Sequence, residues 1–357
     1  MYCKLRILGA ALVFLLVACS GEAQRRRTPT AAASTPTLRL ASPQSGTKVK
    51  NGERLTVSSL HSYTGYDSVV ASLDGRRIAR MADTSADVEV ETKTLGVKQL
   101  KVTAYSEGKE AAAARVSITV LAPKPPKMYG YAVVNVYPHD EHAYTQGLLM
   151  YRDELYEGLG EYGKSAVRKV ELRSGKTLQQ KELHDRYFGE GICILNGLLY
   201  QLTWREQTCL VYNAETLEQQ ATLPYAGEGW GLTTDGTHLI MSNGSNALNF
   251  MSPGNLAVQK RLEVYTDRRA VGQLNELELI DGEVWANVYG SDNIVCIDTA
   301  SGAVTGVIDM QGLLPDNLTD RHTDVLNGIA YNEKTGQIFV TGKNWKRLFE
   351  IKPRTKK

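Results

Sequence analysis

The chain has few cysteines, and they form no disulfide pattern. Five occur among 357 residues, and only Cys193, Cys209 and Cys296 lie beyond the first 20 positions. Small disulfide-stabilised domains carry an even and closely spaced set of cysteines. An odd, scattered set therefore excludes that class, and we expect three buried free thiols with no catalytic role.

The sequence also lacks a charge imbalance and the common catalytic motifs. Lys and Arg total 41 against 39 for Asp and Glu. No overall field therefore favours nucleic acid, and we expect no nucleic-acid partner. No G-x-S-x-G, P-loop or H-E-x-x-H motif occurs. His139 and His142 have a spacing seen in metal sites, but no third ligand follows them, so we expect no zinc site.

Residues 1–19 read as an export signal. Lys4 and Arg6 precede an apolar run from Ile7 to Val17, which is too short to span a membrane. The letters LVAC resemble a bacterial lipoprotein processing box, in which Cys19 becomes the lipidated first residue. A plain signal peptide cut within ACSGEAQ is the alternative. The lipoprotein interpretation predicts an exported bacterial protein, anchored by lipid in the periplasm, at the outer membrane or at the cell surface.

Three segments follow before the longest domain. Residues 20–37 are rich in Thr, Ala, Pro and Ser and predict a flexible tether. Residues 38–122 contain about seven short runs of alternating apolar and polar residues, separated by turns, which predict an immunoglobulin-like β-sandwich. This segment has no cysteine pair, and nothing in it looks catalytic. Residues 123–127, in the stretch APKPPK, predict a stiff linker.

Residues 128–357 contain an internal repeat. Five segments begin alike: TQGLLMY, GEGICIL, GWGLTTD, LNELELI and LNGIAYN. Each precedes a second and a third strand pattern, and four of the five add a fourth, with a period of 40 to 52 residues. This period predicts a five-bladed β-propeller, and an all-β chain overall. The last repeat lacks a fourth strand, so we expect the spare strand Gly130–Pro138 to close the ring.

Aligning the repeats places one set of residues at the start of the innermost strands: Gln146, Glu190, Trp230, Asn275 and Asn327. A second set ends the second strands: Gly160, Trp204, Gly244, Tyr289 and Lys343. Convergent polar and aromatic side chains at a channel mouth predict a site for a small polar ligand. The plainer interpretation is that these polar groups only hydrogen-bond one another and water. Against it stands the single carboxylate of the first set, Glu190, because a carboxylate walled by tryptophan tends to have a raised pKa suited to proton transfer.

At these residues the sequence resembles a known family. The segments YFGEGICIL, GWGLTTDG, LNELELIDGEVWANVYGSD and VTGKNWKRLFEI resemble the glutaminyl-peptide cyclotransferases of plant and bacterial type, over roughly Tyr131 to Lys352. The resemblance implies a five-bladed propeller. It also implies conversion of an N-terminal glutamine to pyroglutamate with release of ammonia, so peptides or proteins that begin with glutamine are the expected partners.

The resemblance also implies roles for individual residues. Glu190 matches the family's catalytic glutamate, and Lys343 and Asn275 are expected to assist it. The residues expected to bind substrate are Gln146, Trp204, Trp230, Trp285, Asn287, Tyr289 and Asn327. Tyr289 is a departure, since plant members carry a second Trp in the motif WANVW. No cofactor is expected to be required, although some members carry a calcium ion in the channel, which leaves room here for a structural calcium held by backbone oxygens.

Two other interpretations stay open at this point. A non-catalytic secreted propeller that binds peptides or glycans would use the polar ring for recognition alone. A calcium-dependent lactonase-like propeller would need several acidic ligands in the ring, where the aligned position supplies one. We expect a monomer that contacts the membrane only through the lipid at Cys19.

Overall fold

The computed structural model describes residues 38–356 apart from residues 64 and 83. The predicted export signal, the lipidation residue Cys19 and the tether fall in residues 1–37, outside the described residues. The described chain is built of β-strands, with one short 3-10 helix, η1 (Asp316–Leu318), which confirms the predicted all-β class. None of its helices is long and apolar enough to cross a membrane.

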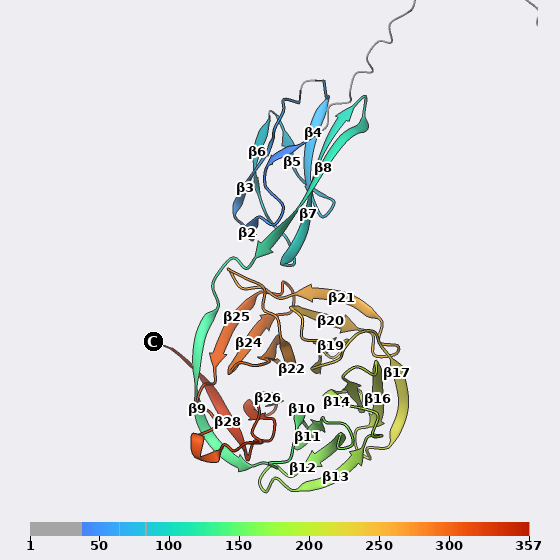
Figure 1. The fold of residues 1–357 in the computed structure, drawn as a ribbon, viewed down its shortest axis with the longest axis vertical. Helices are drawn as coiled ribbons and strands as arrows, with labels where there is room; N and C mark the ends of the chain where they lie inside the picture. Colours follow the sequence, from blue (N-terminus) through green and yellow to red (C-terminus); the bar gives the residue numbers. More distant parts are fainter. Residues whose placement is uncertain (1–37, 64, 83, 357) are drawn as a thin grey trace, which may run out of the picture. The chain divides into compact units, whose positions relative to one another are not determined.

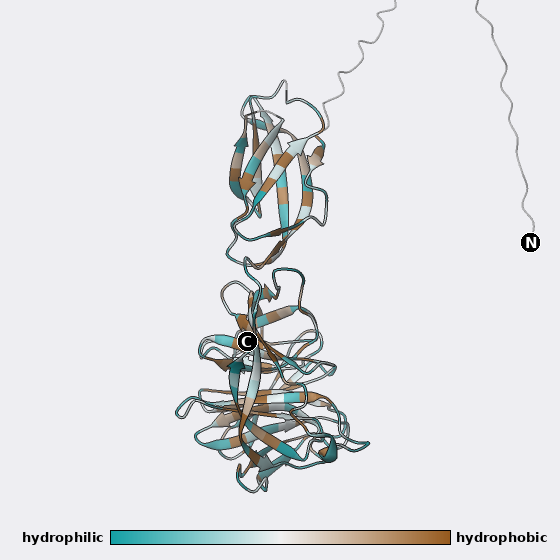
Figure 2. Ribbon diagram, turned by 90° about the vertical axis from the view of Figure 1, so that its left-hand side faces the viewer, coloured by the Kyte–Doolittle hydropathy of each residue, from teal (hydrophilic) through white to brown (hydrophobic). Residues whose placement is uncertain are grey.

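Residues 38–122 form two sheets. One has the order β1 (Leu40–Ser42), β3 (Arg54–Ser59), β6 (Ser85–Glu89), and the other β2 (Lys48–Lys50), β8 (Lys109–Leu121), β7 (Gly96–Ser106), β4 (Ser68–Leu73), β5 (Arg76–Met81). Apolar and polar residues alternate along these strands (Figure 2). The alternation buries one face of each sheet in a shared core, which includes Val57 from the first sheet and Leu100 from the second.

Each of the first three repeats folds into its own four-stranded antiparallel sheet, with the strands in chain order. The first sheet has β10 (Thr145–Tyr151), β11 (Glu154–Leu159), β12 (Ala166–Val170) and β13 (Thr177–Glu182). The second has β14 (Gly189–Leu195), β15 (Leu198–Thr203), β16 (Thr208–Asn213) and β17 (Gln219–Pro224). The third has β18 (Leu232–Thr234), β19 (Leu239–Met241), β20 (Ala247–Met251) and β21 (Val258–Glu263).

The last two repeats share one eight-stranded sheet. The fourth repeat supplies β22 (Leu274–Ile280), β23 (Glu283–Val288), β24 (Asn293–Asp298) and β25 (Val304–Asp309), and the fifth supplies β26 (Leu326–Asn332), β27 (Gln337–Gly342) and β28 (Arg347–Thr355). Between them lies β9 (Lys127–Pro138), which pairs with β28 of the last repeat, as predicted for the closing strand, and is antiparallel to it. The first residues of β9 also run parallel to β25, a pairing that the repeat pattern did not predict.

The first strands of the five repeats surround a common axis. Each of β10, β14, β18, β22 and β26 contacts the next one, and β26 contacts β10, so the five strands form a closed ring (Figure 1). Glycine lets neighbouring strands approach closely here. A Cβ on Gly191 would lie 2.5 Å from the backbone nitrogen of Leu232, and a Cβ on Gly231 would lie 2.0 Å from the carbonyl oxygen of Asn275. The result is a propeller-like arrangement of sheets.

Candidate active site

A pocket of about 270 Å³ lies where the first strands of the ring begin. Its lining residues are Tyr144, Gln146, Phe188, Glu190, Trp204, Trp230, Asn275, Tyr289 and Lys343. Gln146, Glu190 and Asn275 are the second residues of β10, β14 and β22. Trp204, Tyr289 and Lys343 directly follow β15, β23 and β27. Because the first two strands of each repeat are antiparallel, the start of one lies beside the end of the other, and the two aligned sets meet.

The acidic group of the pocket is held by a relay of two amides. Oε1 of Glu190 accepts a hydrogen bond of 3.2 Å from Nε2 of Gln146. Oε1 of Gln146 in turn accepts a hydrogen bond of 3.4 Å from Nδ2 of Asn327, which also donates to the carbonyl oxygen of Thr145 at 2.9 Å. Asn327 does not line the pocket, so the structure places it behind Gln146, where it fixes the direction in which that amide points.

Burial and charge act in opposite directions on Glu190. The side chain is only 4% exposed. Burial raises the pKa of Glu190 well above its ordinary value; the positive charge of Lys343 opposes this rise, and the negative charges of Glu228 and Glu206 add to it. Burial lowers the pKa of Lys343, against the attraction of Glu190 and Asp324. The pocket thus brings a carboxyl group that readily holds a proton close to an amine that readily loses one.

Aromatic rings form the walls of the pocket. Phe188 meets Trp204 edge to face at 5.5 Å between centroids, and Trp230 meets Tyr289 in the same way at 5.7 Å. Nζ of Lys343 lies 4.6 Å from the ring centroid of Tyr144 and 5.4 Å from that of Tyr289. The ammonium group therefore lies against aromatic faces, and its N–H groups can donate to a ligand.

Asn275 supplies an open acceptor. Its side chain is 2% exposed, and its Oδ1 atom is buried with no hydrogen-bond partner among the described residues. Since Asn275 lines the pocket, this oxygen can accept an N–H group of a ligand that enters it. The pocket thereby offers a carboxyl group, an amide acceptor and an ammonium group between apolar walls.

Besides Asn327, two predicted site residues, Trp285 and Asn287, lie away from the pocket lining. Trp285 is buried in an apolar cluster with Ile294 and Phe349. Asn287 is fully buried, and its Oδ1 accepts the N–H group of Gly328 at 3.0 Å, which ties the fourth repeat to the fifth. The geometry therefore gives both residues a structural role in the packing of the repeats. Trp230 differs from its expectation in a smaller way, because it precedes β18 instead of beginning it.

Two pocket residues were missed by the repeat alignment, Tyr144 and Phe188. Each lies two positions before an aligned residue, in the sequences YTQ and FGE. Side chains two apart in an extended segment point to the same side, so this spacing was the available signal. The glycines of the second aligned set also have a role. A Cβ on Gly160 would lie 2.6 Å from the ring of Phe188, and one on Gly244 would lie 2.7 Å from that of Trp230.

The His139 and His142 pair does not form a shared site. Nε2 of His139 lies 2.9 Å from Oε1 of Glu157, and its Nδ1 lies 2.7 Å from the carbonyl oxygen of Trp345. Burial opposes protonation, but Glu157 and the carbonyl group outweigh it and raise the pKa of His139. His142 is exposed. Both ring nitrogens of His139 are therefore engaged in a buried ion-pair network.

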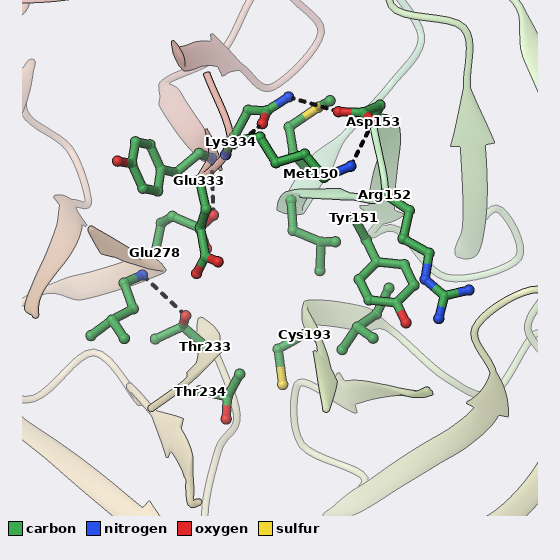
Figure 3. A pocket seen from close by; sticks show the side chains of 15 residues that line it. Met150, Tyr151, Arg152, Asp153, Cys193, Thr233, Thr234, Glu278, Glu333 and Lys334 are labelled. Atoms are coloured by element: carbon green, nitrogen blue, oxygen red, sulfur yellow. Dashed lines mark hydrogen bonds and ion pairs between the residues drawn. The ribbon is translucent and has the colours of Figure 1, made fainter. Parts of the chain in front are cut away.

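A second pocket of about 270 Å³ lies at the opposite ends of the same five strands (Figure 3). Its lining includes Glu278, whose pKa burial raises to about 8, and the exposed ion pair between Lys334 and Asp153. Oε1 of Glu278 accepts the backbone N–H group of Tyr331 at 2.9 Å. No residue of the two aligned sets lines this pocket, so the predicted chemistry belongs to the first one.

The calcium ion that the family resemblance allows can be compared with the side chains of the channel. Calcium takes about six to eight oxygen ligands, with carboxylates prominent among them. No three His, Cys, Asp or Glu side chains gather into a metal-binding group in the part of the chain that the structure describes. The two oxygens of Glu276 in β22 each accept a backbone N–H group, from Leu148 and Ile329. These side chains do not fit a calcium ion held by carboxylates, and a calcium ion held by backbone oxygens stays a prediction.

The chain is similar to known glutamine cyclotransferases. The sequence model of the glutamine cyclotransferase family matches residues 100–353, which contain every residue of the pocket. The glutaminyl-peptide cyclotransferase of Arabidopsis thaliana is 42% identical over 224 residues, which cover 62% of this chain and 70% of that protein. The crystal structure of Myxococcus xanthus glutaminyl cyclase superposes with a TM-score of 0.61 at 32% identity, and covers 65% of this chain and 100% of that one. The chain therefore belongs to the glutamine cyclotransferase family.

Proposed function

We propose that the protein is a glutaminyl-peptide cyclotransferase that converts the N-terminal glutamine of peptides or proteins to pyroglutamate and releases ammonia. The observation that carries this proposal is a buried carboxyl group, Glu190, held by Gln146 in an aromatic pocket with Lys343 and the open acceptor of Asn275. The family's activity needs one proton to be moved within an enclosed polar site. This pocket has one acidic side chain in its lining, and aromatic rings form its walls.

The reaction can be written on this chain's residues. The neutral α-amine attacks the carboxamide carbon of the glutamine side chain, and the Glu190 carboxylate takes a proton from the attacking nitrogen. When the tetrahedral intermediate collapses, its bond to the carboxamide nitrogen breaks and Glu190 returns the proton, so the group leaves as ammonia. Lys343 carries the positive charge that favours the developing oxyanion. The pocket contributes by holding the two ends of the glutamine together.

We also propose that the ring is a five-bladed propeller with residues 38–122 as an immunoglobulin-like sandwich. The ring of five first strands and the pairing of β9 with β28 support the first assignment. Eight strands in two sheets around one core support the second.

The activity can be tested directly. The purified protein is incubated with a glutaminyl dipeptide amide, and ammonia is measured against the spontaneous rate. We expect release well above that rate, and we expect Glu190→Gln to keep the fold but to lower kcat by roughly 100-fold or more. Ammonia release no faster than the spontaneous rate would contradict the proposed enzyme and favour a binding protein. Near-normal turnover by the variant would place the proton transfer on another group.

We further propose that the protein is a lipoprotein anchored through Cys19, in the periplasm or at the outer membrane or cell surface. The processing-box letters LVAC carry this proposal. Cys19→Ser should move the protein from the membrane fraction to the soluble fraction of expressing bacteria. A variant that still sediments with membranes would point to another means of attachment.

A further inference from the structure

Glu228 lies outside the lining of the pocket but touches two of its walls. Its Oε2 atom accepts a hydrogen bond of 2.9 Å from Nε1 of Trp204 and one of 3.1 Å from Nε1 of Trp230. Trp204 follows β15 of the second repeat, and Trp230 precedes β18 of the third. One carboxylate oxygen therefore joins aromatic walls that come from two different sheets.

Glu228 is itself held in place from the other side. Its Oε1 accepts a hydrogen bond of 3.1 Å from Nε of Arg205, and the Arg205 guanidinium carbon lies 3.7 Å from the ring centroid of Trp204. The backbone N–H group of Gly229 donates to the carbonyl oxygen of Trp204 at 3.0 Å, which fixes the segment beside that residue. Three side-chain N–H groups thus donate to this carboxylate, from Trp204, Trp230 and Arg205.

The repeat explains how Glu228 comes to this place. It occupies the position two residues before Trp230, which corresponds to Tyr144 in the first repeat and Phe188 in the second. Those two side chains line the pocket directly. In the third repeat the equivalent side chain instead accepts the indole N–H groups of the wall.

The charge of Glu228 also reaches the acid of the pocket. Although burial opposes it, the hydrogen bonds from Trp230, Trp204 and Arg205 lower the pKa of Glu228, so the group is anionic. Its charge raises the pKa of Glu190, as does that of Glu206, while Lys343 lowers it. The other titratable groups whose pKa values respond to Glu190 are Tyr144, Tyr162 and Tyr225.

We propose that Glu228 is a positioning residue that holds the indole walls of Trp204 and Trp230 at one spacing, and so sets how tightly the pocket holds a glutaminyl side chain. This inference rests on the proposed function. An indole that loses its acceptor is free to rotate about its side-chain torsions and to turn its N–H group to water. A second consequence concerns pH, because the anionic group near Glu190 shifts the range in which Glu190 is ionised.

Two substitutions separate the effects of the acceptor and the charge. Glu228→Gln removes the charge but keeps a carbonyl oxygen for the indole N–H groups, whereas Glu228→Ala removes both. We expect Glu228→Ala to raise KM for a glutaminyl dipeptide amide about tenfold with a smaller change in kcat, and Glu228→Gln to restore most of the lost affinity. Both variants should move the acid limb of kcat/KM to lower pH, since both remove a charge that raises the pKa of Glu190.

A matched control is available in the second repeat. Glu215 forms an exposed ion pair with Arg152, as Glu228 does with Arg205, but it touches neither tryptophan. We expect Glu215→Gln to leave KM, kcat and the pH profile unchanged. A Glu228→Ala variant with wild-type KM and wild-type pH profile would overturn the proposal.

A readout independent of activity tests the contact itself. The chain has four tryptophans, and their indole N–H signals can be followed by nitrogen-15 NMR in the intact protein. In Glu228→Ala the signals of Trp204 and Trp230 should shift and exchange faster with solvent, while those of Trp285 and Trp345 stay as internal references. Unchanged signals would overturn the positioning role whatever the activity. A wild-type protein that releases no ammonia would overturn the proposed function and the catalytic part of this inference, while the indole signals still decide whether the carboxylate holds the walls.

Discussion

The pKa of a single buried acid, Glu190, depends on charges that come from several loops around it. Lys343 is the neighbour that lowers this pKa, and Glu228 and Glu206 raise it. If the ionised form of Glu190 accepts the proton from the substrate amine, activity rises with pH through this pKa. The acid limb of the pH profile therefore reports the balance of these charges.

Replacing Lys343 should move that limb in a defined direction. Lys343→Met removes the positive charge that lowers the pKa of Glu190, so the pKa rises and the acid limb of kcat/KM should move to higher pH. Steady-state rates over a pH series measure the shift. Lys164→Met, which removes an exposed lysine paired with Glu161, is the control and should leave the limb in place. A shift to lower pH would contradict the assigned coupling.

Single residues also show how far the sequence could locate the site. Repeat alignment placed Glu190, Lys343 and Trp204 correctly in one pocket, because equivalent strand ends meet in a ring. Trp285 was expected there from the family motif. It lies an even number of positions before Tyr289, so both side chains point to the same side of the extended segment. Four residues along a strand correspond to about 13 Å, however, so Trp285 lies deep in the sheet while Tyr289 reaches the pocket. Odd or even spacing along a strand predicts the face on which a side chain lies. It does not predict how far that side chain lies from the strand end at the pocket.

At the scale of elements, a buried ion-pair network joins β11 and β12 to the segment after β9. Arg168 donates to Oε2 of Glu157 through Nε at 2.9 Å and through Nη2 at 2.7 Å. Thr145 donates to Oε1 of Glu157 at 2.6 Å. Burial opposes ionisation, but His139 and Arg168 outweigh it and hold the pKa of Glu157 well below its ordinary value. The histidine that sequence alone offered as a metal ligand is thus part of the framework of the first repeat.

Neutralising the centre of this network should destabilise the protein. Glu157→Gln leaves Arg168 and His139 buried without their shared charge, and breaking a buried pair costs about 3–5 kcal/mol. We expect a clearly lower thermal midpoint by calorimetry. Asp153→Asn, which removes an exposed partner of Lys334, is the matched control and should leave the midpoint unchanged. Equal midpoints for the two variants would contradict a structural role for the network.

Strand pairing between distant segments was only partly predictable. The missing fourth strand of the last repeat pointed to β9 as its partner, and β9 does pair with β28. The parallel pairing of β9 with β25 left no trace in the repeats, because no turn connects the two strands and each has its own antiparallel neighbour. Pairings of that kind depend on the closed ring, which no local pattern encodes.

For the molecule as a whole, Glu276 takes the place of a glycine in the ring. The residue after the aligned position is Gly147, Gly191, Gly231 and Gly328 in the other repeats. In the fourth repeat Glu276 reaches across to the N–H groups of Leu148 at 3.1 Å and Ile329 at 2.8 Å. One side chain thereby links the fourth repeat to the first and to the fifth.

Removing that side chain should loosen the centre of the ring. Glu276→Ala leaves two buried N–H groups without acceptors, at about 1–3 kcal/mol each. We expect a lower thermal midpoint together with faster hydrogen exchange at Leu148 and Ile329, measured by NMR or by mass spectrometry of the peptides that contain them. Wild-type protection of both amides in the variant would show that other groups satisfy them.

The pairing of β9 with β28 has a consequence for how the chain is made. The strand that closes the ring is synthesised before any repeat, and its antiparallel partner is synthesised after all the other strands of the repeats. Until then β9 has no antiparallel partner, and the pairing that closes the ring of five repeats cannot form. A stop codon that removes β28 would therefore deprive both β9 and β27 of their antiparallel neighbour, and would leave the ring open.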